Sequence, residues 1–249
     1  MKYEPAPDLL KDRVILVTGA GDGIGRTAAK SYARHGATVI LLGRTVSKLE
    51  SLYDEIVESG GPEPGIAPMD LVQTSAAPML ELADVINDRY GRLDGLLHNA
   101  AILGKLMPFE TYDPNEWMQV MQVNLNSVFL LTRVMIATLR KSPDARIIFT
   151  SSGVGAKPRA YWGAYSVSKY AMEGLAKLLA LEMANTSSIR VNILNPGGTR
   201  TRMRAAAFPQ EDPLTLKTPA ELMPLYLYLM GPDSKGEQGK TFNPDWLAG

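Results

Sequence analysis

Short apolar, β-branched runs alternate with longer helical windows along most of this 249-residue chain. The runs that we expect to be strands are Arg13–Val17, Thr38–Leu42, Ile66–Met69, Leu93–Leu97, Arg146–Thr150, Arg190–Leu194 and the short Thr241–Phe242. The windows that we expect to be helices are Gly23–His35, Val46–Glu58, Ser75–Tyr90, Pro114–Arg140, Ala164–Ala184 and Pro219–Met230. Alternation of this kind builds right-handed β-α-β units around a parallel sheet. The sequence therefore predicts an α/β fold.

No internal repeat or linker divides the chain, so we expect one domain over residues 1–249. Its least regular segment, at about 198–217, is predicted to be a loop or lid. Apolar residues make up 45% of the chain, charged residues make up 21%, and the formal net charge is zero. This composition is typical of a soluble globular protein, and without a basic stripe we expect no nucleic-acid partner.

The chain contains no cysteine, which excludes disulfides, thiolate metal sites and cysteine nucleophiles, and we expect no metal. Its first residues lack the apolar run of a signal peptide. We expect no apolar run that approaches the roughly 18 residues a membrane span needs. We therefore expect a cytoplasmic protein without a membrane partner.

A glycine-rich turn follows the first predicted strand and opens the first predicted helix. It reads Thr18, Gly19, Ala20, Gly21, Asp22, Gly23, Ile24, Gly25. Glycines let the backbone approach a pyrophosphate, and the free N–H groups at a helix start attract its charge. The pattern predicts a dinucleotide site, although a structural turn without a ligand is the alternative.

The end of the second predicted strand indicates which dinucleotide binds. An acidic residue there accepts hydrogen bonds from a free ribose 2′-hydroxyl, whereas an arginine accommodates a 2′-phosphate. The strand ends in Gly43 and Arg44, with no acid at its tip. NADP(H) is therefore favoured and NAD(H) is possible, with a solvated Arg44 as the alternative. Asp22 counts slightly against the phosphate, since a basic residue in the turn would have helped to hold it.

Three residues form a candidate catalytic group: Ser152, Tyr165 and Lys169. Tyr165 and Lys169 are four apart in a helical window and share a face, and Ser152 lies just past the fifth strand. A phenol protonates a carbonyl oxygen well when its pKa falls toward neutrality, and we expect the Lys169 ammonium to lower it. Ser152 would hold the substrate oxygen. The alternative is a tyrosine at an interface beside a surface lysine.

These motifs resemble the short-chain dehydrogenase/reductase family from about Leu9 to Phe242. The resemblance is carried by the glycine turn, by His98-Asn-Ala-Ala101, by Ser152, Tyr165 and Lys169, and by Pro196-Gly197. Within the family, the chain is most similar to the YciK-like oxidoreductases. The fold implied is a single Rossmann-type, doubly wound parallel sheet with strand order 3-2-1-4-5-6-7, flanked by helices. A homodimer formed through the fourth and fifth helices, or a homotetramer, is also implied.

The resemblance assigns further roles. Asn124 matches an asparagine that completes a catalytic tetrad through a proton relay to the lysine, and a helix–helix hydrogen bond is the alternative. Other positions match cofactor contacts: Asp70 and Leu71 beside the adenine, Asn99, Ala100 and Ala101 after the fourth strand, and Pro196, Gly197, Thr199 and Thr201 beside the nicotinamide or pyrophosphate. Ala101 replaces the family's usual glycine. His98 stands where asparagine is common, and we expect it to be structural.

Together these features predict an NADP(H)-dependent oxidoreductase that interconverts a carbonyl and an alcohol, with Tyr165 as acid or base. A non-catalytic NADP(H) sensor is the alternative, and a sugar-nucleotide epimerase is a weaker one. The apolar candidates for the substrate site are Leu103, Val154, Trp162, Met203 and Phe208. Arg200, Arg202 and Arg204 could instead seat an anion, although we expect most of them to be solvated. Whether the small-molecule substrate is apolar or anionic stays open.

Overall fold

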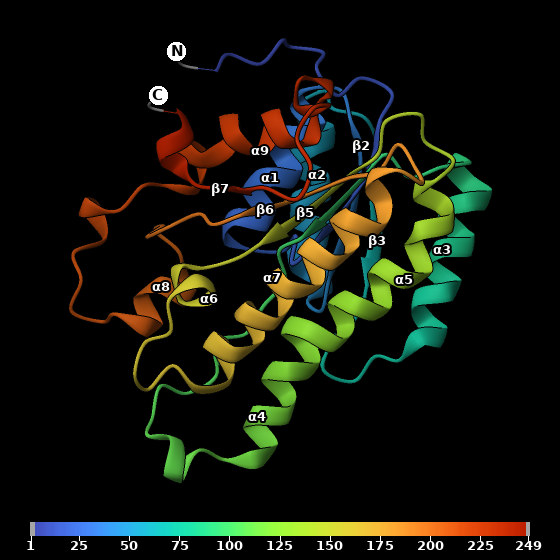
Figure 1. Cartoon of the computed structure of the whole chain (residues 1–249). Coiled ribbons are helices and arrows are strands. Elements are labelled where there is room, and N and C mark those ends of the chain that lie inside the picture. The colour runs from blue at the N-terminus through green and yellow to red at the C-terminus, as the bar shows by residue number, and fades with distance from the viewer. Residues whose placement is uncertain (1–2, 248–249) are drawn as a thin grey trace.

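Seven parallel strands form one sheet in the order β3-β2-β1-β4-β5-β6-β7 in the computed structural model, which describes residues 3–247 (Figure 1). The strands are β1 Val14–Thr18, β2 Thr38–Gly43, β3 Gly65–Pro68, β4 Gly95–His98, β5 Arg146–Thr150, β6 Arg190–Leu194 and β7 Thr241–Phe242. The predicted fold class and strand order are confirmed, and each strand lies within two residues of its predicted bounds.

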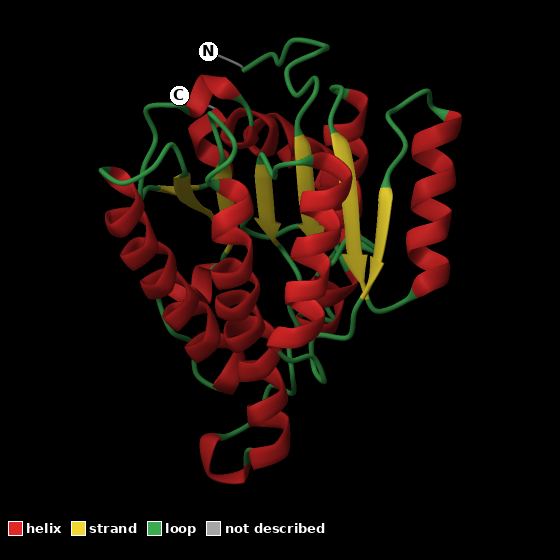
Figure 2. Cartoon of the chain, turned by 90° about the vertical axis from the view of Figure 1, so that its right-hand side faces the viewer, coloured by secondary structure: helices red, strands yellow, loops and turns green. Residues whose placement is uncertain are grey.

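Helices cover both faces of this sheet (Figure 2). One face packs against α3 Ala76–Tyr90, α5 Ser127–Leu139 and α7 Gly163–Ala184. The other packs against α1 Gly23–Arg34, α2 Val46–Glu58 and α9 Met223–Met230. Two apolar cores result, because every central strand is buried on both sides. Shorter helices lie outside these layers: α4 Pro114–Met121, α6 Gly153–Ala156 and α8 Arg202–Ala207.

Two predicted helices differ from the structure. The window Pro114–Arg140 is not one regular α-helix, because a π-helical turn at Gln122–Asn126 separates α4 from α5. The window Pro219–Met230 begins as the 3-10 turn Pro219–Leu222 before α9 starts. The irregular lid segment contains α8 and a 3-10 turn at Pro213–Thr215.

The expectation that no apolar run approaches the length of a membrane span was wrong. The helical stretch Pro114–Leu139 is long and apolar enough, by length and composition alone, to cross a membrane. Half of its most apolar window is buried inside the protein, and α5 contributes core residues such as Leu131 and Met135. The apolar character of this stretch follows from its packing against the sheet and α3.

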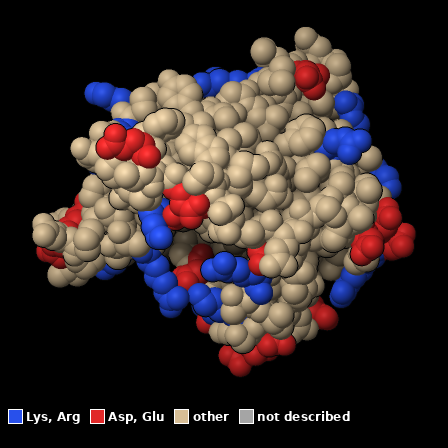
Figure 3. Space-filling view, turned by 90° about the horizontal axis from the view of Figure 1, so that it is seen from below, with Lys and Arg blue, Asp and Glu red and all other residues tan. Residues whose placement is uncertain are grey.

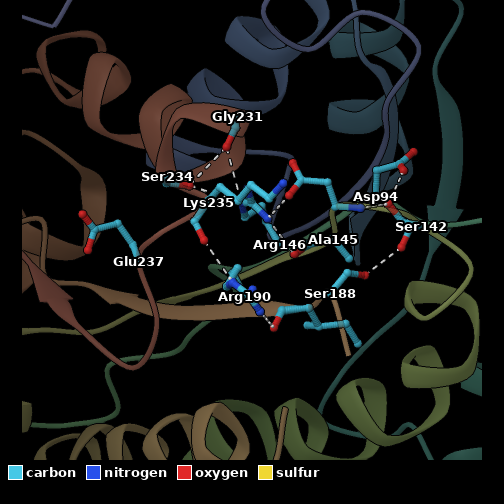
Figure 4. A network of polar contacts seen from close by, with 12 residues as sticks. Asp94, Ser142, Ala145, Arg146, Ser188, Arg190, Gly231, Ser234, Lys235 and Glu237 are labelled. Carbon is cyan, nitrogen blue, oxygen red and sulfur yellow. Dashed lines mark hydrogen bonds and ion pairs between the residues drawn. The ribbon is translucent and has the colours of Figure 1, made fainter. Parts of the chain in front are cut away.

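A buried polar network ties the amino ends of the strands together (Figure 4). Arg146, which begins β5, is wholly buried, and its guanidinium lies 2.7 Å from Asp144. Its Nε donates to the carbonyl of Gly231 and to Ser234 Oγ. These contacts hold β5 to the end of α9, so the network has a structural role. The opposite edge, at the carboxyl ends of the strands, is hollowed and bordered by Lys and Arg side chains (Figure 3).

Candidate active site

One cavity of about 530 Å³ runs along the carboxyl edge of the sheet from the glycine turn to Tyr165. The predicted site residues that line it are Gly19, Gly21, Asp22, Gly23, Ile24, Gly43, Arg44, Asp70, Leu71, Asn99, Ala100, Ala101, Ser152, Tyr165, Lys169, Pro196, Gly197, Thr199 and Thr201. Three predicted residues do not line it: Thr18, Gly25 and Asn124. The structure therefore brings both predicted half-sites into one space.

Thr18 and Gly25 do not line the cavity but fix the shape of the glycine turn. The Thr18 hydroxyl accepts hydrogen bonds from the backbone N–H groups of Asn99 and Ala100, both at 3.0 Å, and so fixes β1 to the end of β4. Gly19 has a φ of +68°, and a Cβ there would lie 2.9 Å from the Cα of Ala100. A Cβ on Gly25 would lie 2.4 Å from the Gly19 carbonyl oxygen. The turn needs glycine at both positions, which leaves a bare backbone cradle of the kind that a pyrophosphate fits.

Asp22 sits at the start of α1 among positive charges. Its carboxylate accepts a hydrogen bond from the N–H of Gly23 and lies 2.8 Å from Lys48 Nζ and 3.3 Å from an Arg202 nitrogen. The hydrogen bond from Lys48 is the main reason that the pKa of Asp22 falls below its usual value. Lys48 is a cavity residue that sequence reasoning missed. Its signal was its place four residues after Arg44, in the first turn of α2.

Tyr165 and Lys169 lie on one face of α7, and both are almost fully buried. Lys169 Nζ donates to the carbonyl of Thr150 at 2.7 Å and lies 5.8 Å from the centre of the Tyr165 ring. Ser152 is the N-cap residue of α6. Because the α7 face meets the end of β5 here, the three side chains share one wall of the cavity.

The expected lowering of the Tyr165 pKa is absent from the free chain. Burial raises the pKa of Tyr165 above its ordinary value, and the hydrogen bond with Ser152 lowers it by less. Burial also lowers the pKa of Lys169 to about 8, which leaves most of these side chains charged at pH 7. Desolvation of the phenol therefore outweighs the hydrogen bond with Ser152.

Asn124 lies inside the π-helical turn and uses its whole side chain in contacts with its neighbours. Its Oδ1 accepts from the N–H of Ile102, and its Nδ2 donates to the Ile102 carbonyl and to Ser168 Oγ, at 2.9 to 3.1 Å. The side chain thus joins the segment after β4 to α7. The helix–helix hydrogen bond that we considered as the alternative is present.

Glu173 is a buried acid that sequence reasoning missed, one turn after Lys169 on α7. Its Oε1 accepts a hydrogen bond from Ser151 Oγ at 2.5 Å, and its Oε2 lies 3.8 Å from Lys177 Nζ. Its charge raises the pKa of Lys169, against the larger effect of burial. Gly155 lies against this group, because a Cβ there would approach the Ser151 hydroxyl to 2.8 Å. The spacing of four residues from Lys169 was the available signal.

His98 packs as a neutral side chain at the end of β4. Its Nε2 lies 2.8 Å from Thr132 Oγ1, and its ring stacks on Phe149 with centroids 4.9 Å apart. Burial, with a smaller contribution from the charge of Lys169, lowers the pKa of His98 to about 3. The structural role that we expected for His98 agrees with these contacts.

The predicted nicotinamide segment forms the base of the lid. Thr199 is buried, donates to the Pro196 carbonyl and pairs with Lys217 through the backbone. Thr201 caps α8 by accepting from the N–H of Arg204. The backbone pairing of Thr199 with Lys217 thereby joins the two ends of the lid to each other.

Comparison with known proteins agrees with this arrangement. The short chain dehydrogenase family profile matches residues 13–212. The uncharacterized oxidoreductase YciK of Escherichia coli K12 is 52% identical over 243 residues, which cover 98% of this chain and 96% of that protein. A short chain dehydrogenase from Escherichia coli CFT073 complexed with NADPH has a TM-score of 0.93 at 52% identity, covering 96% of this chain and 99% of that one. A Shigella flexneri short chain dehydrogenase complexed with NADP has a TM-score of 0.93 at 51% identity, covering 96% and 100% of the two chains. This chain therefore belongs to the short chain dehydrogenase family of oxidoreductases.

Proposed function

We propose that this protein is an NADP(H)-dependent oxidoreductase that interconverts a carbonyl and an alcohol by hydride transfer. The observation that carries the proposal is the single cavity that joins the glycine cradle to Ser152, Tyr165 and Lys169. Dinucleotide and substrate would meet there at the carboxyl edge of the sheet, where α/β proteins bind ligands.

The chain's own residues would handle the proton and the oxygen. A bound nicotinamide supplies the hydride for reduction and accepts it in oxidation. The Ser152 hydroxyl holds the substrate oxygen, and the Tyr165 hydroxyl gives its proton to that oxygen as the carbon gains hydride. The raised pKa of Tyr165 keeps the phenol protonated, which is the form that reduction consumes. The Lys169 ammonium stabilises the phenolate that remains.

Arg44 and Lys48 favour NADP(H) over NAD(H). Both line the cavity next to Gly43, at the end of β2 where a ribose 2′-phosphate would lie. The relatives from Escherichia coli CFT073 and Shigella flexneri were crystallised with NADPH and NADP. Arg44→Ala should weaken NADPH binding about tenfold or more and leave NADH binding nearly unchanged. Equal effects on the two cofactors would remove Arg44 as the specificity residue.

The test of hydride transfer is NADPH consumption across a panel of aldehydes and ketones, with NADH in parallel and Tyr165→Phe as the control. The variant should lose several orders of magnitude in turnover and keep NADPH affinity close to the wild type. A variant that turns over normally contradicts the assignment of Tyr165. Tight NADPH binding with no turnover of any compound would favour the sensor instead.

Self-association is proposed through α4, α5 and α7. Met118, Phe129, Leu178 and Leu181 are apolar, and each is 48% or more exposed on these helices. Light scattering should show a dimer or tetramer, and Leu181→Glu should shift it toward the monomer if this face is the interface. We also propose a cytoplasmic location, to be tested by cell fractionation, since the chain has no cysteine.

A further inference from the structure

The cavity wall beyond Tyr165 is apolar and is built by three separate segments. The apolar cluster there has two layers. Leu103, Trp162, Tyr165, Met203 and Ala207 line the cavity, and Leu106, Val154 and Phe208 belong to the same cluster behind them. This cluster is distinct from the two cores of the sheet. It contains all five apolar residues that the sequence placed near the substrate. An apolar wall with its polar atoms gathered at one end is typical of a site that orients a ligand by its single polar group.

Trp162 is the centre of this wall, and the backbone is shaped to place it there. Its ring centroid lies 5.8 Å from that of Tyr165 and 5.7 Å from that of Phe208. The preceding residue, Tyr161, has a φ of +71°, which is unusual for a bulky residue, and is itself 63% exposed. Trp162, by contrast, is 9% exposed. Strain of this kind persists where the surroundings enforce it, and it often occurs at functional sites.

The three lid arginines all have partners within the protein, although Arg202 and Arg204 line the cavity. Arg204 forms a bidentate ion pair with Glu211 at 2.5 and 2.6 Å. Its guanidinium also lies 3.8 Å from the centre of the Phe208 ring. Arg202 lies against Asp22 on the cofactor half of the cavity, and Arg200 donates to the backbone carbonyl of Pro213.

Arg204 is therefore the lid cation nearest to the apolar wall, and its charge is already balanced. A substrate carboxylate at this wall would have to take Arg204 away from Glu211 and leave that acid without its partner. Desolvating the new anion among apolar side chains would add a further cost. The charges of Arg202 and Arg204 are thus paired within the protein, with Asp22 and Glu211 respectively.

We propose that the substrate is a neutral, ring-bearing carbonyl compound whose ring packs on the part of the cavity wall formed by Leu103, Trp162 and Met203, while its oxygen meets Ser152 and Tyr165. This inference rests on the proposed function. Of the two substrate classes left open by the sequence, it names the apolar one. An apolar wall that contains an aromatic side chain, with polar groups at one end, favours a flat apolar ring over a flexible polar chain.

The test compares two alcohols that differ by one charge: 1-phenylethanol and its para-carboxylate. Their binding to the NADP+-saturated protein is measured by calorimetry, which does not require turnover. We expect the neutral alcohol to bind at least about tenfold more tightly. Equal or tighter binding of the carboxylate overturns the proposal, and so does the absence of binding by both alcohols.

Trp162→Leu should weaken binding of 1-phenylethanol about tenfold, because the variant loses the aromatic part of the cavity wall. Trp246→Leu is the matched control, since Trp246 is 38% exposed and does not line the cavity, and it should bind like the wild type. Kinetics with acetophenone and 4-acetylbenzoate then separate the two levels of inference. Selective binding without turnover refutes the proposed function alone, whereas turnover that prefers the benzoate refutes the substrate class alone.

Discussion

The charge on Lys169 depends on a buried acid one helical turn away, and replacing that acid tests the dependence. Glu173→Gln keeps the size of the side chain and an oxygen that can accept from Ser151, but it removes the negative charge. Burial already brings the pKa of Lys169 down to about 8, and Glu173 is the group that raises it. A nearby opposite charge moves a pKa by roughly 1–3 units. We therefore expect the variant's Lys169 pKa to fall by at least about 1 unit.

The sign of the effect on catalysis follows from the role of the ammonium. A lysine with a lower pKa loses its proton at a lower pH, so stabilisation of the Tyr165 phenolate is lost earlier as the pH rises. The alkaline limb of the kcat–pH profile should move by about 1 unit or more toward acid. His98 also faces Lys169, but with a pKa of about 3 it stays neutral across this range. The midpoint of the limb does not depend on the fraction of active enzyme, so partial misfolding would not mimic the shift.

Lys177→Gln is the matched control for this experiment. Lys177 is the other charged partner of Glu173, but its side chain is 57% exposed, so water screens its charge. Its removal should move the limb by less than about 0.3 units. Glu173→Asp, which restores the charge, should return the limb toward its wild-type position. An unmoved limb in Glu173→Gln would refute the reasoning.

Two further predictions concern residues packed around the same site. Gly155→Ala should cost about 1–3 kcal/mol in the free energy of unfolding by urea, because its Cβ would meet Ser151 Oγ at 2.8 Å, whereas Gly174→Ala, with nothing within 4 Å, should not destabilise. Equal costs would contradict this account of packing. The folded-state pKa of His98 lies below its unfolded value of 6.5, so its contribution to stability is complete above that pH and is lost as the pH falls toward 3. Between pH 7 and 4.5, the free energy of unfolding of the wild type should fall by roughly 2–3 kcal/mol more than that of His98→Asn, as measured by urea titration. Equal decreases in the two proteins would contradict this prediction.

The sheet was predictable from sequence because its strands are buried on both faces. Such strands read as continuous apolar runs, and their alternation with helical windows leaves few topologies. The π-helical turn at Asn124 was not predictable, because one extra residue in a turn hardly disturbs the apolar pattern of a long helix. Its position at Asn124 brings that side chain to both Ile102 and Ser168.

The sequence predicted which residue types form the site. It was a poorer guide to the protonation states and ion pairs of those residues. Ser152, Tyr165 and Lys169 follow a spacing that one helix and one strand end bring together. The charge state of Lys169 also depends on Glu173, which is held by Ser151 from another segment, and such pairing is set by tertiary packing. In the same way, the alternate spacing of the lid arginines allowed an anion site or solvated side chains, but Arg202 and Arg204 on α8 instead pair with Asp22 and Glu211.

The lid is held by two ion pairs of unequal strength. We expect the lid to open when the stronger pair is lost and to stay closed when the weaker pair is lost. Arg202 is 81% exposed and Asp22 is 48% exposed, so their pair on the cofactor side contributes about 0–1 kcal/mol. The bidentate pair of Arg204 and Glu211 is more than two-thirds buried at both side chains and is backed by Phe208. Hydrogen exchange at amides 208–216 should therefore accelerate in Arg204→Gln and stay unchanged in Arg202→Gln. If exchange at these amides accelerated in Arg202→Gln and not in Arg204→Gln, the prediction would be wrong. The ion pair of Arg202 and Asp22 would then be the contact that keeps the lid closed, because a segment opens more readily when the contact that holds it is removed.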